Sequence, residues 1–449
     1  MKIIIIGAGK VGTTLAEHLT TEGHQITIVD SSEEALRQVG ERLDVMTVEG
    51  PGASFDTLME AGVDTADLLI TVTGTDELNL LTCLIGRKLG KCQTIARVRS
   101  PEYSVMLPRL REELGLSMSV NPEQDCAREM LRVLRFPSAI HIDTLARGRV
   151  ELLKLRVEAN SPLVGMKLWE LSHFRSKVLV CGVEREDQVI IPDGSFVLNA
   201  GDLISIVAAP TEAAAFFKAV GIVTNPVKNV VIAGGGRIAF YLARQLLSMG
   251  VSVKIIEQDR AHCEQLSEQL PKAHIIHGDA TNQQLLLETG IRHADAFVAL
   301  TGINEENIFM SLYVRSISQA KVLTKLNRSG FENIIATLDL GSIFYPRYIA
   351  TERILQYVRG RQASRSSSIE TLLKILDNKA EALEFAVTGK SVVTGIPLMQ
   401  LRLRKNLLIA AINRSGRIII PSGQDTIEPG DTVVVVTTER LSQLTDIRG

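Results

Sequence analysis

The sequence predicts an α/β protein in which two Rossmann-like, doubly wound parallel sheets follow one another, each followed by a small α+β C-terminal subdomain. The glycine-rich motif GAGKVG at residues 7–12 follows a short apolar strand, and GGGRIA at residues 234–239 follows another, 227 positions later. An acidic residue follows each motif at the same offset, Asp30 in the first copy and Glu257 in the second. A whole module is therefore repeated, as in a protein that binds nucleotides twice.

The first βαβ unit begins with four isoleucines at residues 3–6. This apolar run is too short for a helix and predicts a buried parallel strand. The apolar stripe of residues 11–19 predicts a helix that ends at Gly23, and residues 25–29 predict the next strand, which ends at Asp30.

The rest of the first sheet follows the same alternation of strand and helix. We expect a helix closing at residues 58–61, a strand at 68–72, a helix at 77–89 and a strand at 94–98. The motif VTGTDELN at 72–79 returns as LTGINEEN at 300–307, and residues 230–326 repeat the whole order. This pattern predicts an open parallel sheet that binds a ligand at the carboxyl ends of its strands.

A different pattern follows each sheet. Residues 124–134 predict an amphipathic helix that stops before Pro137. Short alternating strands are then expected, in the first half at 152–157, 177–185, 188–194 and 202–209, and in the second half at 382–387, 406–414, 416–423 and 431–438. Each half therefore ends in a small β-rich subdomain.

The segment RGRQASRSSS at residues 359–368 is polar, basic and rich in serine. It is either a mobile loop that contacts a partner or a solvated linker into a helix at 369–376, and its composition favours the linker. The expected domains are 1–120 (Rossmann-like), 121–139 (crossover helix), 140–221 (C-terminal subdomain), 222–227 (linker), 228–346 (second Rossmann-like domain), 347–368 (crossover helix and Ser-rich linker) and 369–449 (second C-terminal subdomain).

Composition limits the functional classes. The chain has 449 residues, enough for three or four domains, with 45% hydrophobic and 22% charged residues as in folded soluble proteins. Its net charge of −2 gives no basic field that would attract nucleic acid.

The cysteines and the N-terminus bear on the compartment. The five cysteines include no CxxC pair, which favours a reducing compartment, and we expect Cys83 and Cys92 to be small apolar residues of the core. No apolar stretch approaches 18 residues and the N-terminus lacks signal-peptide features, so we expect neither a pore nor a secreted protein.

The glycine motif has a physical role at each position. A tight turn at Gly7, close backbone approach at Gly9 and close helix packing at Gly12 direct amide N–H groups and the helix dipole toward a pyrophosphate. The candidate residues of the two turns are Gly7, Ala8, Gly9, Lys10, Val11 and Gly12, and Gly234, Gly235, Gly236, Arg237 and Ile238.

The acidic residues complete the dinucleotide pattern. Asp30 lies 18 positions after Gly12, and Glu257 lies 18 positions after Ala239. A carboxylate near this spacing accepts hydrogen bonds from ribose hydroxyls and repels a 2′-phosphate, so NAD(H) is preferred over NADP(H). The second crevice is either a second nucleotide site or a degenerate scaffold.

Polar and basic residues recur at equivalent positions around the crevices. Lys10 and Arg237 share one position, and Arg97 and Lys325 end the same later strand. These cations either pair with phosphates of NAD, ATP or ADP or are solvated surface residues. Two further pairs, Thr73 with Gly74 and Thr301 with Gly302, border the crevices.

Asp279, in the motif GDAT at 278–281, has no counterpart in the first copy. It is either a carboxylate near adenine or ribose in the second crevice, or part of a helix N-cap with Thr281, and its residue type favours the cap. The eight histidines are dispersed, and His274 and His277 are expected to be surface residues rather than a metal pair. No catalytic motif is present, so we expect no enzymatic activity and no metal site.

Taken together, GAGKVG, Asp30, VTGTDELN, IARVRSPEY at 95–103, GDAT and the doubled layout resemble the regulator-of-potassium-conductance (RCK) family over essentially the entire chain. The resemblance implies a cytosolic ring, with a tetramer expected, that attaches at the inner face of the cell membrane to a potassium-translocating subunit such as TrkH or TrkG. It also implies regulation by NAD(H), and by ATP or ADP. The second copy departs from the pattern, with Lys325 for Arg97 and Gly330-Phe331 for Glu102-Tyr103.

Three alternatives stay open at this point. An NAD-dependent dehydrogenase would need a catalytic group opposite the nicotinamide, which the sequence does not offer. A regulator of another cation transporter, such as a potassium/proton antiporter, would carry the same crevices. An oligomeric scaffold with degenerate crevices would bind no nucleotide.

Overall fold

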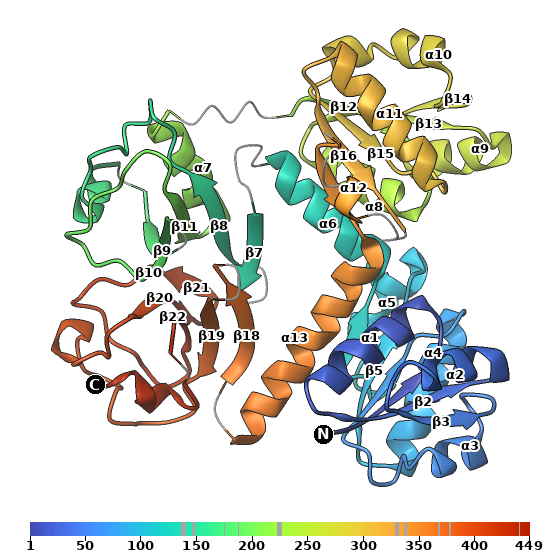
Figure 1. Cartoon of the computed structure of the whole chain (residues 1–449), viewed down its shortest axis with the longest axis horizontal. Coiled ribbons are helices and arrows are strands. Elements are labelled where there is room, and N and C mark those ends of the chain that lie inside the picture. Colours follow the sequence, from blue (N-terminus) through green and yellow to red (C-terminus); the bar gives the residue numbers. More distant parts are fainter. Residues whose placement is uncertain are drawn as a thin grey trace. The chain divides into compact units, whose positions relative to one another are not determined.

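The computed structural model of the chain describes residues 1–135, 141–145, 149–174, 176–186, 188–221, 227–327, 332–335, 338, 340–366, 369–376, 379–439 and 441–449. These residues form two compact units, each assembled from both halves of the sequence (Figure 1). The first unit comprises Met1–Leu131 and Val227–Leu355, and the second comprises Arg132–Pro226 and Gln356–Gly449.

The first Rossmann domain is a six-stranded parallel sheet in the order β3-β2-β1-β4-β5-β6. Its strands are β1 (Lys2–Ile6), β2 (Gln25–Asp30), β3 (Met46–Glu49), β4 (Leu68–Thr71), β5 (Gln93–Arg97) and β6 (Met118–Val120). The helices between them are α1 (Lys10–Thr21), α2 (Glu33–Gly40), α3 (Phe55–Glu60), α4 (Asp76–Leu89) and α5 (Pro101–Leu110).

The second Rossmann domain repeats this topology with the order β14-β13-β12-β15-β16-β17. Its strands are β12 (Asn229–Ala233), β13 (Ser252–Glu257), β14 (His274–His277), β15 (Ala296–Ala299), β16 (Lys321–Lys325) and β17 (Ser342–Phe344). Its helices are α8 (Arg237–Ser248), α9 (Arg260–Gln269), α10 (Gln283–Glu288), α11 (Asn304–Ile317) and α12 (Glu332–Ile335).

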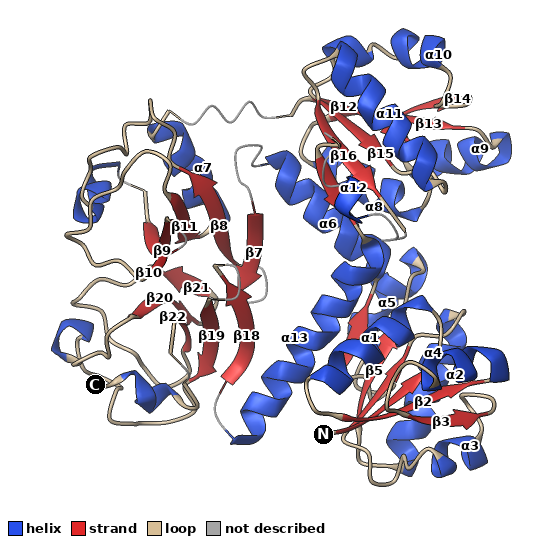
Figure 2. Cartoon of the chain, in the orientation of Figure 1, coloured by secondary structure: helices blue, strands red, loops and turns tan. Residues whose placement is uncertain are grey.

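Helices cover both faces of each parallel sheet (Figure 2). The four consecutive isoleucines of β1 are each no more than 2% exposed, which requires cover on both faces because neighbouring side chains point to opposite sides. The strand order reverses between β1 and β4, the place where doubly wound sheets open a crevice at their carboxyl edge. The expected fold class is confirmed.

The second unit contains two five-stranded antiparallel sheets, β10-β9-β11-β8-β7 and β18-β19-β22-β20-β21. Their strands are β7 (His141–Leu145), β8 (Val150–Arg156), β9 (Val178–Arg185), β10 (Gln188–Ile190), β11 (Leu203–Ala208), β18 (Ile369–Ile375), β19 (Ala380–Ala386), β20 (Leu407–Arg414), β21 (Arg417–Ile419) and β22 (Thr432–Thr437). Helix α7 (Pro210–Ala219) covers the first sheet with Phe216 and Phe217 in its core.

A shared hydrophobic core joins the two antiparallel sheets. Leu152, Cys181 and Val207 of the first sheet belong to one cluster with Leu373 and Ala411 of the second. The close approach depends on small residues: a Cβ added at Gly182 would lie 2.5 Å from a methyl group of Leu376. The C-terminal subdomains of the two repeats are therefore packed together as a pair.

Two expectations about the end of the second repeat are wrong. Residues 369–376 were expected to be helical, but Ile369–Ile375 form β18, in which Ile369, Leu373 and Ile375 are buried at a period of two and pair with β19. Residues 359–366 of the polar segment are not a linker, because helix α13 extends from Pro346 to Ser366, while residues 367–368 lie outside the described residues. Arg, Gln and Ala are good helix formers, and no proline follows residue 346 in this segment.

The crossover helix expected near 124–134 is α6 (Pro122–Arg135), the counterpart of α13. Within the described ranges, no helix combines the length and the apolar character needed to cross a bilayer. Cys83 and Cys92 are buried as expected, and burial raises the pKa of the Cys83 thiol to about 12.

Candidate functional site

The first glycine turn joins β1 to α1. Gly7 adopts a φ of +110°, a conformation open to glycine but strained for other residues. A Cβ on Gly12 would lie 1.9 Å from the carbonyl oxygen of Gly7, so helix α1 can sit against the turn only without a side chain there. Gly9 has open space where its Cβ would be, which leaves room for a ligand to approach the backbone.

Asp30 at the end of β2 is held beside this turn. Its Oδ2 accepts a hydrogen bond from the Ala8 N–H at 2.7 Å, and its Oδ1 accepts one from the Ser32 N–H at 3.0 Å. Glu257 makes the same arrangement in the second copy, where its two carboxylate oxygens accept from the N–H groups of Gly235 at 2.8 Å and Asp259 at 2.9 Å. Both acids are therefore held against the glycine turn at the end of the second strand of their sheet.

A buried asparagine fixes the neighbouring strand ends. The Oδ1 of Asn79 accepts hydrogen bonds from the N–H of Thr73 at 2.8 Å and its hydroxyl at 2.7 Å, and the Asn79 amide donates to the Arg97 carbonyl at 2.9 Å. Asn307 does the same for Thr301 and Lys325. Sequence reasoning missed this role, although the asparagine is the last letter of both repeated motifs.

Two arginines extend over the crevice from the end of β5. Arg97 donates to the Thr73 carbonyl, and the Nη2 of Arg99 donates to the Gly74 carbonyl at 2.9 Å. Burial lowers the pKa of Arg97, and the positive charge of Arg99 lowers it further. The Nε atoms of both arginines are buried and make no hydrogen bond among the described residues.

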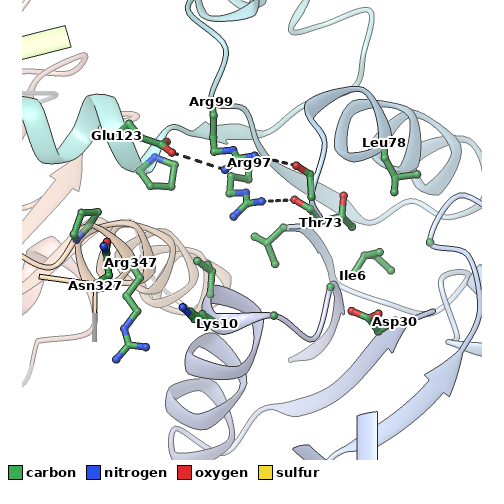
Figure 3. Close-up of a pocket in the computed structure, with 18 of the residues that line it drawn as sticks. Ile6, Lys10, Asp30, Thr73, Leu78, Arg97, Arg99, Glu123, Asn327 and Arg347 are labelled. Atoms are coloured by element: carbon green, nitrogen blue, oxygen red, sulfur yellow. Dashed lines mark hydrogen bonds and ion pairs between the residues drawn. The ribbon is translucent and has the colours of Figure 1, made fainter. Parts of the chain in front are cut away.

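These groups border a cavity of about 1040 Å³ within the first unit (Figure 3). The first copy contributes the turn, the strand ends and the start of α6, while the second copy contributes its own strand-end loops and the start of α13. The charged lining residues are Lys10, Asp30, Arg97, Arg99, Glu123, Glu305 and Arg347. The volume suits a nucleotide, because small-molecule sites typically span roughly 300–1,000 Å³.

Most of the expected residues of the first copy line this cavity. They are Gly7, Gly9, Lys10, Val11, Asp30, Thr73, Gly74 and Arg97, joined by Gly302 of the second copy. Ala8 and Gly12 belong to the turn but do not line the cavity. Sequence reasoning missed Arg99, Glu123, Asn327 and Arg347, because only the packing of one copy against the other brings the last two to the first crevice.

The second crevice differs in its turn and its cation. His262 Nε2 lies 3.0 Å from the Gly235 carbonyl oxygen, a contact that Ala35 at the equivalent position in the first copy cannot make. Lys325 donates to the Leu300 carbonyl at 3.2 Å, and burial lowers its pKa. Gly330 and Phe331, the other departures in this copy, lie outside the described residues.

Asp279 takes part in a turn rather than a helix cap. Its Oδ1 accepts hydrogen bonds from the N–H of Thr281 at 2.8 Å and from its hydroxyl at 2.7 Å. The N-cap of α10 is Asn282, so neither Asp279 nor Thr281 is the cap that the sequence suggested. The Thr281 hydrogen bonds also lower the pKa of Asp279.

Two polar contacts join the copies beside the cavity. The hydroxyl of Tyr241 in α8 contacts Asn121 and the Arg99 carbonyl of the first copy. Arg353 of α13 pairs with Asp125 of α6. No group of three or more potential metal ligands occurs in the part of the chain that the structure describes.

Family comparisons match both halves of the chain. The TrkA-N domain matches residues 3–122 and 230–346, and the TrkA-C domain matches residues 152–221 and 382–448. Among curated relatives, the Trk system potassium uptake protein TrkA of Haemophilus influenzae is 31% identical over 98% of this chain and 96% of that protein. The TrkA of Halomonas elongata is 32% identical over 98% of this chain and 96% of its own.

Solved structures share the fold at lower identity. The GsuK channel bound to NAD is 20% identical with a TM-score of 0.64, covering 97% of this chain and 76% of that one. The GsuK RCK domain is also 20% identical, with a TM-score of 0.62 and coverage of 97% and 92%. The repeated domains and the full-length relatives together show that the chain belongs to the TrkA family of Trk system potassium uptake proteins.

Proposed function

We propose that this chain is a non-enzymatic, nucleotide-binding regulatory subunit of a Trk-type potassium uptake system. The observation that carries the proposal is the composition of the first crevice. A ribose-binding acid, an open glycine turn and four cations line one cavity. Acid and cations of this kind fit the ribose and phosphates of one nucleotide.

The expected ligands are NAD(H) and the adenine nucleotides ATP and ADP. One solved structure of the GsuK channel is described as bound to NAD, and another structure of GsuK as bound to ADP. In the first copy we assign ribose binding to Asp30 and phosphate binding to the turn Gly7–Gly12, Thr73, Gly74 and Arg97. In the second we assign the equivalent roles to Gly234–Ile238, Glu257, Asp279, Thr301, Gly302 and Lys325.

The expected partner is a potassium-translocating membrane subunit of the TrkH or TrkG kind. The relatives named above are Trk system potassium uptake proteins, and no helix in the described residues could itself span a membrane. We place the chain in the cytoplasm, at the inner face of the membrane through this partner. We expect a homo-oligomeric ring, with four chains as the expected number.

Regulation then follows from unequal affinity. A nucleotide that binds one arrangement of the two Rossmann domains more tightly shifts the population toward that arrangement, whereas equal affinity shifts nothing. Helices α6 and α13 run from the first unit of the chain into the second, so they can carry such a change to the C-terminal subdomains. Coupling of about 1–3 kcal/mol is usual for regulation of this kind.

Gly9→Ala tests nucleotide control. Gly9 has a φ of −73° and open space at its Cβ position, so alanine is compatible with the fold but occupies the path of a ligand to the backbone. We expect weaker binding of NADH or ATP, and loss of nucleotide-dependent potassium flux in liposomes that contain the matched membrane subunit.

Two further variants make this result specific. Gly389→Ala, in the second C-terminal subdomain, also meets open space and should leave binding and flux unchanged. Gly236→Ala probes the second crevice in the same way. Unchanged flux in Gly9→Ala despite lost nucleotide binding would refute the regulatory role, while NADH turnover with a metabolite would favour the dehydrogenase alternative.

A further inference from the structure

The second residues of α6 and α13 occupy equivalent positions in the repeat but carry opposite charges. Each helix begins with a proline separated by one residue from the last strand of its parallel sheet, Pro122 after β6 and Pro346 after β17. The next residue is Glu123 in the first copy and Arg347 in the second. Both line the same cavity, so the exchange of charge bears directly on what binds there.

Charged side chains line the cavity from one end to the other. Asp30 lies at one end beside the glycine turn, Lys10 and Arg97 lie in the middle, and Arg347 enters from the other side (Figure 3). A nucleotide whose ribose is bound by Asp30 and whose first phosphate lies on the turn therefore directs its remaining groups toward Arg347. Arg347 is half-buried, with its guanidinium packed 4.7 Å from the centre of the Tyr348 ring.

Arg347 is the cation that the second copy contributes to the cavity. The two lining carboxylates other than Asp30 are Glu123, which lies 3.9 Å from Arg99, and Glu305. A dinucleotide would place an uncharged or cationic nicotinamide near Arg347, whereas a nucleoside di- or triphosphate would place its terminal phosphate there. Guanidinium groups pair strongly with phosphate, and the pairing strengthens as the site loses water.

The second crevice lacks the same set of cations. Asn327 stands at the position of Arg99, and Lys325 stands at the position of Arg97. Burial raises the pKa of Glu123 and the charge of Arg237 lowers it, while burial lowers the pKa of Lys325 and the charge of Glu123 raises it, so this carboxylate also lies near the cations of the second crevice. Additional phosphate charge is therefore accommodated better in the first crevice than in the second.

We infer that Arg347, supplied by the second repeat, recognises the terminal phosphate of a nucleoside di- or triphosphate bound in the first crevice. The inference rests on the proposed nucleotide-binding function. It makes Arg347 a specificity-determining residue, and it makes the bound phosphate a direct link between the first glycine turn and the start of α13.

The test compares ATP, ADP and AMP binding to the full chain by calorimetry, for the natural protein and for Arg347→Gln, Arg347→Lys and Arg292→Gln. Arg347→Gln should weaken ATP binding about tenfold or more, as expected for loss of a charge-assisted hydrogen bond, and leave AMP binding within about twofold. Arg347→Lys should keep part of the preference for ATP over AMP that Arg347→Gln loses. Arg292→Gln, which changes an exposed arginine of the second repeat that does not line the cavity, should not weaken ATP binding.

The outcomes separate the two claims. If the natural protein binds ATP and Arg347→Gln keeps the same preference for ATP over AMP, the role of Arg347 is overturned while the proposed function stands. If the natural protein binds neither these nucleotides nor NAD(H), both fail. If the natural protein and Arg347→Lys unfold at the same temperature, a difference in their ATP binding is not caused by loss of the packing of Arg347 on Tyr348.

Discussion

The side-chain amide of Asn121 donates a hydrogen bond to the hydroxyl of Tyr241 at 3.0 Å, and that hydroxyl donates to the backbone carbonyl of Arg99 at 3.1 Å. Asn121 and Arg99 belong to the first Rossmann domain, and Tyr241 lies in α8 of the second. Tyr241 is 1% exposed. This network therefore joins the two repeats and also positions the backbone of a residue that lines the cavity.

Tyr241→Phe should loosen this junction. The ring remains, but the Arg99 carbonyl and the Asn121 amide each lose a buried partner, which costs about 1–2 kcal/mol. We expect a lower free energy of unfolding of the first unit, and faster amide hydrogen exchange in β5, β6 and α8, measured by mass spectrometry.

Tyr103→Phe is the matched control for this change. The Tyr103 hydroxyl also makes a hydrogen bond, to Glu77 at 2.8 Å, but this contact is exposed and within the first copy. Its loss should cost less than about 0.5 kcal/mol. Equal effects of the two variants on exchange in α8 would show that the Tyr241 hydroxyl does not join the repeats.

The sequence predicted the parallel sheets better than the antiparallel ones. Runs such as residues 3–6 and Gly breaks at strand ends have few other interpretations, and they recur in both copies. The strand at Ile369–Ile375 was missed because a segment of seven apolar and polar residues fits both periods, and only pairing with β19 decides between them.

The candidate site was predictable as far as it is local. The turn at Gly7 and the acid at Asp30 follow from spacing within one βαβ unit, and both line the cavity. Asn327 and Arg347 could not be assigned to the first crevice in this way. Their place there depends on the packing of the two copies, which strand and helix periodicity do not specify.

An arginine–aspartate pair stabilises each C-terminal subdomain. Arg185 donates to both carboxylate oxygens of Asp202 at 2.7 Å, and Arg414 contacts Asp431 in the same way at 2.9 and 2.8 Å. Burial raises the pKa of Asp202, but the hydrogen bonds from Arg185 and from the Asn199 N–H outweigh it and lower the pKa below its ordinary value.

Asp202→Asn should therefore destabilise the first C-terminal subdomain in a pH-dependent way. We expect a loss of about 2–3 kcal/mol near neutral pH, less than for a fully buried pair because the Arg185 side chain is 30% exposed. A lowered pKa stabilises the fold above the unfolded value of about 3.9, and this stabilisation is lost as pH falls through the lower folded pKa. The difference between the two proteins should therefore shrink below about pH 4.

Trp169 makes this measurement specific to one subdomain. It is the single tryptophan of the chain and lies in a short 3-10 helix, Leu168–Phe174, of the first C-terminal subdomain. Its fluorescence during urea unfolding reports that subdomain directly. Glu158→Gln, which removes an exposed carboxylate from the same subdomain, should change little. A constant difference between Asp202→Asn and the natural protein from pH 7 to pH 3 would contradict the assigned role of the carboxylate.

Equivalent positions of α4 and α11 carry exposed apolar side chains, which we expect to be buried between chains of the proposed ring. Leu81 is 49% exposed and Phe309, 228 positions later, is 70% exposed. Burying each side chain would contribute about 1.5–3 kcal/mol, enough to change an association constant by tenfold or more. The double variant Leu81→Asp, Phe309→Asp should therefore lower the mass measured by analytical ultracentrifugation without lowering the thermal stability of the chain.

Met249→Asp is the matched control, because Met249 is 50% exposed but its counterpart in the first repeat is Glu22. An unchanged mass in the double variant would place the contacts between chains elsewhere.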